Sequence, residues 1–294
     1  MISVVIPMYN EEAAIADELE GMRRTMDGIG LPYEIVVVDD GCTDRSVEIV
    51  QGFTEIPFRG EGVVLVQHPC NRGTGAARTT GIKAAQGDII VMIDADGTYP
   101  HDAIPDMVAE VQRGSSMVIG ARRRESGTVR WLRAPTKWFI RQLASYLTAT
   151  HIPDLNSGLK VFRRDIALKY VSILPTTHSW VSTITIAFLS DGYPVKWLPI
   201  DYYPRKGKSS FHPISDTYNY ISLVVRAVMY FNPLKVFLPV TLVLLLTGIA
   251  KLIRDIIYYH GFYVPGVTLM LVLTAIQVGA IGLLADLIVK RGRG

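Results

Sequence analysis

Cysteine is scarce in this chain, whose 294 residues include only Cys42 and Cys70. The two do not form a Cys-x-x-Cys pair, so neither a zinc site nor a disulfide framework is indicated, and we expect a reduced, cytosolic active domain. The net charge is only +3 and the basic residues lie in patches, which argues against a nucleic-acid partner. The first residues lack the charged and apolar regions of a signal peptide and read instead as a strand over residues 2–6.

Hydrophobic residues make up 49% of the chain and are concentrated after Pro233. Residues 234–253 and 264–289 form two apolar runs, and each contains only two charged or amide residues. Each run is long enough for the roughly 20 residues that span a bilayer. Because the segment between them is short, the sequence predicts a transmembrane helical hairpin.

Basic residues predict the orientation of this hairpin. Lysine and arginine are more frequent on the two flanks than near the turn, where only Lys251 and Arg254 lie. Basic residues stay on the cytoplasmic side of membrane proteins. We therefore expect a multi-pass protein of the cell (inner, cytoplasmic) membrane, with the main domain and both termini in the cytoplasm. The flanking basic residues are Lys206, Lys208, Arg226 and Lys235 before the hairpin, and Lys290, Arg291 and Arg293 after it.

Residues 1–125 alternate short apolar runs with helical patterns. This alternation predicts an α/β fold with a doubly wound, mostly parallel sheet, whose ligands bind beyond the carboxyl ends of the strands. The predicted strands are 2–6, 34–38, 63–67, 89–93 and 117–120. The predicted helices lie near 11–26, 44–53, 75–85 and 103–113.

Two carboxylates follow the fourth predicted strand, where Asp94, Ala95, Asp96 and Gly97 end an apolar run. Such a sequence can be a simple turn, because aspartate and glycine favour turns. The position after a buried strand favours a site, because two ionised aspartates are costly to desolvate without a cation. Carboxylates of this kind suit Mg²⁺ or Mn²⁺ held together with substrate phosphates. In that interpretation Asp96 holds the cation against a diphosphate, and Asp94 supports the cation or a ribose.

Polar residues also follow the first and second predicted strands. Asp39 and Asp40 are placed to accept hydrogen bonds from the base or ribose of a nucleotide, while Thr43 or Asp44 can cap the next helix. The glycine-rich segment 71–77 opens a helix but lacks the Lys-Ser/Thr of a Walker loop. We interpret it as close packing between strand and helix, with Arg72 near the diphosphate.

Two further segments have an amphipathic pattern. Near residues 131–147, Arg133, Lys137 and Arg141 repeat every four residues opposite an apolar face. Such a helix suits a membrane surface, but an ordinary domain helix with a solvated basic side has the same pattern. Residues 213–233 are similar and are interpreted as a juxtamembrane amphipathic helix.

Taken together, these motifs resemble the family 2 glycosyltransferases of GT-A fold. The later motifs are similar to the polyprenyl-phosphate branch, which includes dolichol-phosphate mannose synthase and bacterial undecaprenyl-phosphate glycosyltransferases. The resemblance covers nearly the whole chain, including the two-helix tail. The motifs are 8–12 (Met-Tyr-Asn-Glu-Glu), 39–44 (Asp-Asp-Gly-Cys-Thr-Asp), 71–73, 94–97, 154–163 and 203–209. The implied division is a catalytic domain over 1–212, the amphipathic segment 213–233 and the hairpin over 234–294.

The resemblance implies a role for each motif. Arg205 and Lys208 are expected on a loop that closes over the donor diphosphate, and Arg122 and Ser157 match positions associated with the acceptor phosphate. Thr98 stands where the mannose synthases often carry a metal-contacting glutamine, and Ser210 where many relatives have lysine. The residues expected to bind the donor are Pro7, Tyr9, Asn10, Glu11, Asp39, Asp40, Asp94, Ala95, Asp96, Arg205 and Lys208, with the metal at Asp94 and Asp96.

The acceptor then decides the expected mechanism. A phosphomonoester has a second pKa of about 6, so at neutral pH it is already a nucleophile and needs no separate base. We expect it to attack the anomeric carbon directly with inversion, while the metal, Arg205 and Lys208 stabilise the leaving diphosphate. Arg122 positions the acceptor phosphate; Arg133 and Lys137 either assist it or bind anionic lipid headgroups.

The donor sugar, the choice between UDP and GDP, and the oligomeric state (homo-oligomers included) stay open at this point. One alternative is a transferase that acts on a hydroxyl of a lipid or polysaccharide. It would need a further acidic base, and the chain has no Gln-x-x-Arg-Trp sequence. Another alternative is a non-catalytic nucleotide-sugar-binding membrane protein, against which the full set of acidic residues argues.

Overall fold

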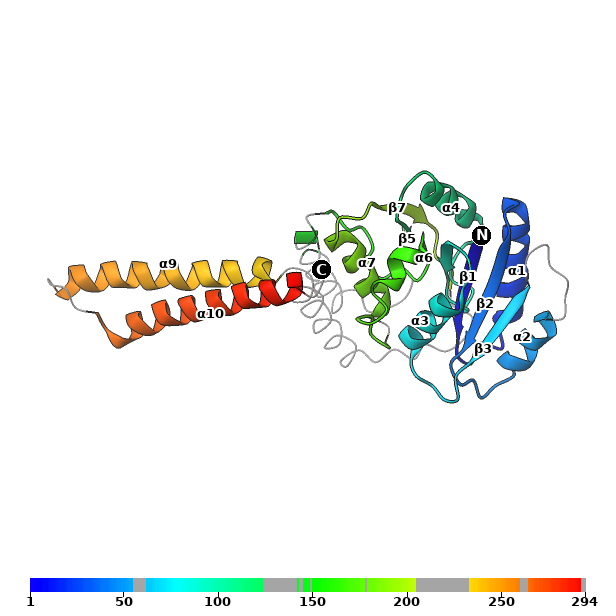
Figure 1. The fold of residues 1–294 in the computed structure, drawn as a ribbon, viewed down its shortest axis with the longest axis horizontal. Helices are drawn as coiled ribbons and strands as arrows, with labels where there is room; N and C mark the ends of the chain where they lie inside the picture. Colours follow the sequence, from blue (N-terminus) through cyan, green and yellow to red (C-terminus); the bar gives the residue numbers. More distant parts are fainter. Residues whose placement is uncertain are drawn as a thin grey trace. The chain divides into compact units, whose positions relative to one another are not determined.

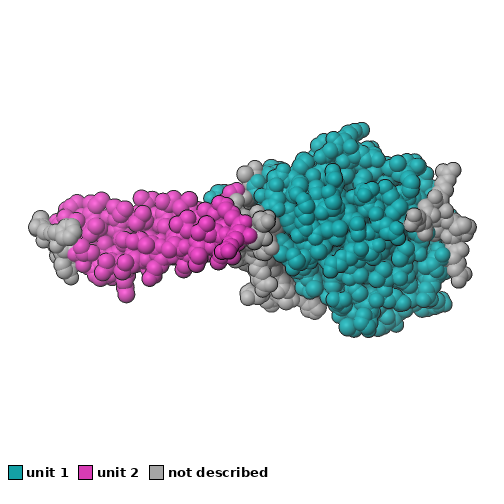
Figure 2. All heavy atoms as spheres, viewed as in Figure 1, with its two compact units in different colours: residues 1–223 teal, residues 224–294 magenta. Residues whose placement is uncertain are grey.

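The computed structural model describes residues 1–54, 62–123, 142, 145, 146, 148, 150–177, 179–204, 233–259 and 264–291. The chain divides into two compact units, Met1–Leu223 and Val224–Gly294 (Figure 2). Most of the predicted amphipathic segments, 131–147 and 213–233, lies outside the described residues.

The first unit contains a seven-stranded sheet in the order β3-β2-β1-β4-β6-β5-β7. All paired strands are parallel except β6, which is antiparallel to both β4 and β5. The five predicted strands and the mostly parallel sheet are confirmed, whereas β6 and β7 were not predicted. The strands are β1 Ile2–Met8, β2 Tyr33–Asp39, β3 Val63–Gln67, β4 Ile89–Met92, β5 Met117–Arg122, β6 Lys160–Arg163 and β7 Val195–Ile200.

Helices cover both faces of this sheet. The apolar residues of α1 (Ile15–Ile29), α2 (Ser46–Thr54) and α4 (Ile104–Gln112) share one core with alternate strand residues such as Val4 and Val91. On the opposite face, α3 (Thr74–Ala84) packs against β1 and β2, and α7 (Trp180–Ser190) packs against β6 through Phe162 and Phe188. The described residues of this unit also form the short elements η1 (His101–Ala103) and α6 (Arg164–Leu168). All four helices predicted from the sequence are present.

Side-chain spacing explains why these helices pack as they do. In α1, Leu19, Met22 and Met26 recur every three or four residues and are fully buried. Burying a side chain of this size contributes about 1.5–3 kcal/mol. On the other face α3 approaches the sheet closely, because a Cβ atom on Gly81 would lie 2.2 Å from Cγ1 of Val5.

The strand register brings the predicted motifs to one edge of the sheet. Met8 pairs with Asp39, so β1 and β2 end side by side, and Met92 at the end of β4 pairs with Lys160 at the start of β6. Because β6 is antiparallel, the loop that precedes it lies at the same edge as the turns that follow β1, β2 and β4. This edge is the location of the candidate site.

The second unit is a hairpin of α9 (Leu234–Tyr259) and α10 (Gly266–Arg291) (Figure 1). By length and composition both helices can cross a membrane. Helix α9 extends beyond the predicted end at residue 253. The helices pack through small residues, since a Cβ atom on Gly282 would lie 2.5 Å from Cβ of Phe237. Asp255 accepts hydrogen bonds from Lys251 within α9 and from Thr268 of α10, which joins the two helices near the turn.

Candidate active site

The acidic turn after β4 is fixed by its own short-range contacts. Asp96 is 8% exposed, and its Oδ1 accepts hydrogen bonds from the backbone N–H (3.2 Å) and the hydroxyl (2.6 Å) of Thr98. Gly97 has a φ of 69°, a left-handed conformation that glycine adopts without strain. Ala95 is buried beneath the turn. The two carboxylates are therefore held at the carboxyl edge of the sheet, as the sequence predicts.

Asp94 is fixed from two sides. Nη2 of Arg78, from α3, lies 2.6 Å from Oδ1 of Asp94. On another side, Gly158 leaves room for the carboxylate, because a Cβ atom there would lie 2.2 Å from Oδ2 of Asp94. The Asp94 side chain is still 28% exposed, so part of it is accessible to a ligand. Arg78 was not among the predicted site residues.

The loop after β1 is tied to the loop after β2. Asn10 has a φ of 54° and its Oδ1 accepts a 2.8 Å hydrogen bond from the backbone N–H of Thr43. The backbone N–H of Glu11 donates to Oγ of Ser46 at 2.9 Å. Pro7 is buried in β1, whereas Tyr9 is 45% exposed beside these contacts. The predicted nucleotide-binding residues of this loop therefore lie together on a braced surface.

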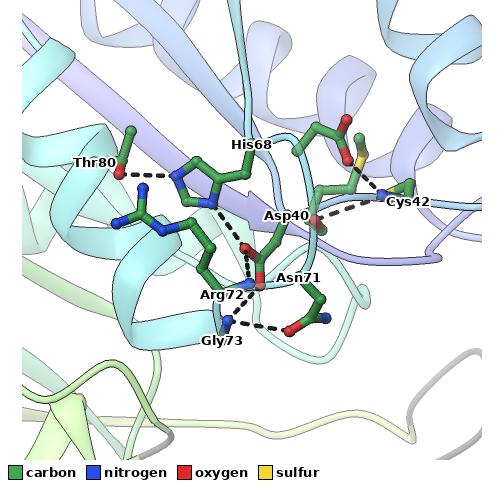
Figure 3. A network of polar contacts seen from close by, with 9 residues as sticks. Asp40, Cys42, His68, Asn71, Arg72, Gly73 and Thr80 are labelled. Carbon is green, nitrogen blue, oxygen red and sulfur yellow. Dashed lines mark hydrogen bonds and ion pairs between the residues drawn. The ribbon is translucent and has the colours of Figure 1, made fainter.

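Asp39 and Asp40, at the end of β2, are both buried and both bonded within the chain. Oδ1 of Asp39 accepts a 2.7 Å hydrogen bond from the backbone of Cys42, and its Oδ2 accepts one from Gln67 at 3.2 Å. Asp40 accepts hydrogen bonds from the backbone N–H groups of Arg72 and Gly73, both at 2.9 Å (Figure 3). These contacts hold the loops around the edge in fixed positions.

His68 extends the Asp40 network into α3. Its Nδ1 lies 2.7 Å from Oδ1 of Asp40, and its Nε2 lies 2.9 Å from Oγ1 of Thr80 (Figure 3). Gly75 allows the start of α3 to meet the loop before α7, because a Cβ atom there would lie 2.3 Å from the Pro175 carbonyl oxygen. The glycine-rich segment thus packs closely against the loop before α7, whereas the sequence predicts packing between strand and helix.

The predicted acceptor residue Arg122 forms an ion pair at the end of β5. Its Nε and Nη2 donate to the two carboxylate oxygens of Asp154, at 2.7 and 3.0 Å. Its guanidinium also lies over the ring of Tyr202, 5.3 Å from the centroid. Although burial alone would raise it, the pKa of Asp154 is held below its usual value by the hydrogen bonds and charge of Arg122. The pair is therefore ionised, and Asp154 orients the guanidinium.

Ser157 and Lys160 lie between the acidic turn and this ion pair. The buried Oγ of Ser157 has no hydrogen-bond partner among the residues that the structure describes. Lys160, in β6, is fully buried and its Nζ donates to Oγ1 of Thr185 at 2.9 Å. Burial, together with the positive charges of Arg78 and Arg122, lowers the pKa of Lys160 to about 7, although the carboxylates of Asp154 and Asp94 oppose this shift. Lys160 was not predicted, because a lysine within a strand usually faces solvent.

A pocket of about 320 Å³ borders the acidic turn at Gly97 and lies between the start of α1 and the residues after Gly97. Glu18 and His101 line it, with Oε1 of Glu18 2.9 Å from Nε2 of His101. Burial raises the pKa of Glu18, although its contact with His101 opposes this effect. The apolar pattern of α1 gave no signal for this pair.

Comparison with known proteins identifies the family. Residues 3–171 match glycosyl transferase family 2, and residues 232–290 match the GtrB C-terminal hairpin. The chain belongs to glycosyl transferase family 2. The predicted family membership and the two-helix tail are thereby confirmed.

Curated relatives of this family 2 chain include two undecaprenyl-phosphate 4-deoxy-4-formamido-L-arabinose transferases. The protein from Pseudomonas aeruginosa (strain LESB58) is 34% identical over 166 residues, which cover 56% of this chain and 48% of the relative. The protein from Aeromonas hydrophila is 32% identical over 168 residues, which cover 56% of this chain and 50% of the relative. The match thus spans about half the length of these relatives.

Solved structures share the fold of this family 2 chain. Glucosyl-3-phosphoglycerate synthase from Mycobacterium tuberculosis, in complex with Mn²⁺, UDP and phosphoglyceric acid, has a TM-score of 0.60 and 20% identity, and 78% of each chain is covered. S. aureus TarS 1-349 has a TM-score of 0.55 and 18% identity, with 79% of this chain and 66% of that chain covered.

The acidic turn of this family 2 chain fits a divalent cation. Among the described residues no group of three or more His, Cys, Asp or Glu side chains gathers into a complete cage. Two carboxylates suit Mg²⁺ or Mn²⁺ when substrate phosphates and water supply the other ligands. Asp96 and the partly exposed Asp94 provide that donor set. Four predicted contact residues, Arg133, Lys137, Arg205 and Lys208, lie outside the described residues.

Proposed function

We propose that this chain is a metal-dependent, inverting glycosyltransferase of a membrane, which moves a sugar from a nucleotide-diphosphate sugar to a polyprenyl phosphate. The observation that carries the proposal is the acidic turn at the carboxyl edge of a family 2 sheet, in a chain with two helices of membrane length. The donor is linked to UDP or GDP.

The donor half of the site contains the acidic turn and the braced loops after β1 and β2. Asp96, with Asp94, would hold Mg²⁺ or Mn²⁺, and the ion would stabilise negative charge on the leaving nucleoside diphosphate. Tyr9, Asn10 and Glu11 present a surface to the nucleotide. The predicted contacts of Arg205 and Lys208 with the diphosphate belong to this half.

The acceptor half centres on Arg122. A guanidinium binds phosphate oxygens through charge-assisted hydrogen bonds, and Asp154 holds this one in a single orientation. Ser157 is close in sequence to Asp154, and its hydroxyl, which has no partner among the described residues, can donate to an oxygen of the acceptor. Because a phosphate is largely dianionic at neutral pH, it attacks the anomeric carbon without a protein base.

The names of the curated relatives support a polyprenyl phosphate acceptor, since both relatives are undecaprenyl-phosphate transferases. The hairpin supports it as well, because a polyprenyl phosphate keeps its chain in the bilayer and its headgroup at the surface. We propose that the catalytic unit and both termini are cytoplasmic, in agreement with the basic residues Lys290 and Arg291 at the end of α10.

A transfer assay tests the function. Membranes that carry the full chain are incubated with undecaprenyl phosphate, Mg²⁺ or Mn²⁺, and a panel of nucleotide sugars that includes nucleotide-linked 4-deoxy-4-formamido-L-arabinose. Mass spectrometry of the lipid fraction should show one hexose or pentose added to the lipid phosphate. A product in which the sugar is attached to a hydroxyl would overturn the polyprenyl phosphate acceptor.

Asp96→Ala tests the metal assignment in the same assay. We expect transfer to fall by at least three orders of magnitude, because the ion and the donor diphosphate lose their common anchor. Insertion of the hairpin should not change, and alkaline extraction of the membranes checks this. The matched control is Asp88→Ala, an exposed aspartate just before β4. Full activity of Asp96→Ala would contradict the assignment.

A further inference from the structure

Arg78 lies in helix α3 and is buried, which is unusual for an arginine. Its side chain is 5% exposed, and its one hydrogen bond among the described residues is to Asp94. Its guanidinium lies over the ring of Trp180, 5.8 Å from the centroid. Trp180 is itself fixed, because it is fully buried and its Nε1 donates to Oγ1 of Thr79 at 2.9 Å.

This arrangement is costly for the fold. Nε and Nη1 of Arg78 are buried and have no hydrogen-bond partner among the described residues. Buried donors without partners destabilise a protein, and a buried ion pair is often no more stable than apolar side chains of similar volume. A feature that breaks these rules is best explained by what it does at a functional site. Arg78 donates its hydrogen bond to Asp94, so its function should act on the Asp94 carboxylate.

We propose that Arg78 is a positioning residue, which holds the Asp94 carboxylate in the orientation that the nucleotide-sugar donor and its divalent cation require. The inference rests on the proposed function. Arg78 and Gly158 fix Asp94 from two sides, so the carboxylate has one arrangement before the donor arrives. Arg78 also balances one of the two negative charges of the turn, which lowers the repulsion between Asp94 and Asp96.

This proposal separates the roles of the two aspartates. Asp96 is fixed by its own turn through Thr98, whereas Asp94 depends on a residue from another element, α3. Loss of a residue that orients a metal-site carboxylate typically costs 10- to 100-fold in metal affinity or activity. We expect an effect of that size on removal of the Arg78 guanidinium.

A double-mutant cycle tests the proposal on the full chain in detergent. The variants are Arg78→Met, Asp94→Asn and the double variant, with Arg78→Lys as the conservative replacement and Lys83→Gln, an exposed residue of the same helix, as the control. Calorimetry measures the binding of UDP and of GDP with Mn²⁺, and the transfer assay gives kcat and KM for the donor. Binding of nucleotide and Mn²⁺ needs no lipid acceptor, so it is independent of the acceptor assignment.

If Arg78 acts through Asp94, Arg78→Met weakens nucleotide and Mn²⁺ binding by 10- to 100-fold, and the double variant is no weaker than Asp94→Asn alone. Arg78→Lys should recover part of the loss, which also keeps the test valid if Arg78→Met does not fold. Additive losses in the double-mutant cycle would overturn the positioning role of Arg78 but leave the proposed function intact. Wild-type binding by both Arg78→Lys and Arg78→Met would have the same consequence. A wild-type protein that binds neither nucleotide with Mn²⁺ would overturn the proposed function and this inference with it.

Discussion

Replacement of the buried Lys160 by methionine should make the first unit, Met1–Leu223, more stable, and the gain should depend on pH. Lys160 is fully buried in β6, and burial lowers its pKa from 10.5 to about 7. Methionine has a similar length and no charge. The substitution leaves no unpaired group at Thr185, because the Oγ1 of Thr185 also donates to the carbonyl of Val181 at 2.9 Å.

The size of the effect follows from the two pKa values. Below pH 7 the lysine is charged in both the folded and the unfolded chain, so the folded state bears the full cost of burying the charge. One pKa unit corresponds to 1.36 kcal/mol, so the cost is about 5 kcal/mol. Between pH 7 and 10.5 only the unfolded chain holds the proton, and stability rises with pH. The cost falls to about 1.4 kcal/mol at pH 9.5 and vanishes above pH 10.5.

Tryptophan fluorescence gives a selective assay in the full-length protein. The four tryptophans are residues 131, 138, 180 and 197, so none lies in the hairpin and thermal unfolding in detergent reports on the first unit. A stability change of 1 kcal/mol shifts the Tm of a unit of this size by about 2–4 °C. Lys160→Met should therefore raise the Tm by about 10 °C or more at pH 6, and by about a third of that at pH 9.5.

The comparison with wild type at each pH cancels the titration of groups that both proteins share. Lys83→Met, at an exposed position of α3, is the control and should change the Tm little at either pH. A Tm difference for Lys160→Met that stays constant from pH 6 to pH 9.5 would refute the reasoning. So would a variant less stable than wild type at pH 6, because the buried charge would then be stabilising.

Two other substitutions test close approaches in the structure. Gly158→Ala should lower kcat of transfer by 10- to 100-fold, because the new Cβ atom would lie 2.2 Å from Oδ2 of Asp94, whereas Gly28→Ala, with no atom within 4 Å, should retain activity. Steady-state kinetics with varied donor checks both, and normal kcat in Gly158→Ala would contradict the assigned position of Asp94. Gly282→Leu should separate the hairpin helices, because Cβ of Phe237 occupies the space. Faster proteolysis of the detergent-solubilised hairpin would show this, and unchanged proteolysis would contradict the packing.

The fold could largely be predicted from the sequence where strands are buried on both faces. Short, continuous apolar runs such as residues 36–38 alternate with helical patterns along the chain. In that context such a run indicates a strand of a parallel sheet with both faces covered by helices. By contrast, α7 contains Val181, Ile184 and Ile186, β-branched residues that favour strands, yet it forms a helix buried against the sheet. β6 is only four residues long, and its direction depends on tertiary pairing that a local pattern does not contain.

The site was predictable in part for a similar reason. The carboxyl ends of parallel strands meet at one edge, so Asp39, Asp40, Asp94 and Asp96 could be placed together from the strand pattern alone. Arg78 could not, because an arginine in a helix is usually solvated, and only the packing of α3 against the sheet and against Trp180 of α7 places it beside Asp94. The hydrogen bonds from the backbone of Arg72 and Gly73 to Asp40 could not be predicted either, because they depend on how two loops lie in three dimensions.

The Arg122–Asp154 ion pair has a consequence for the stretch of chain that it closes. The pair joins two points that are 32 residues apart in the chain, at the end of β5 and just before β6. Because the ion pair fixes the two ends of this stretch of chain, its length could change without a shift in the register of β5 and β6. Doubling such a loop adds only about 0.6 kcal/mol to the cost of closing it. We therefore expect residues inserted or deleted between positions 122 and 154 to leave the ion pair and the strand pairing intact.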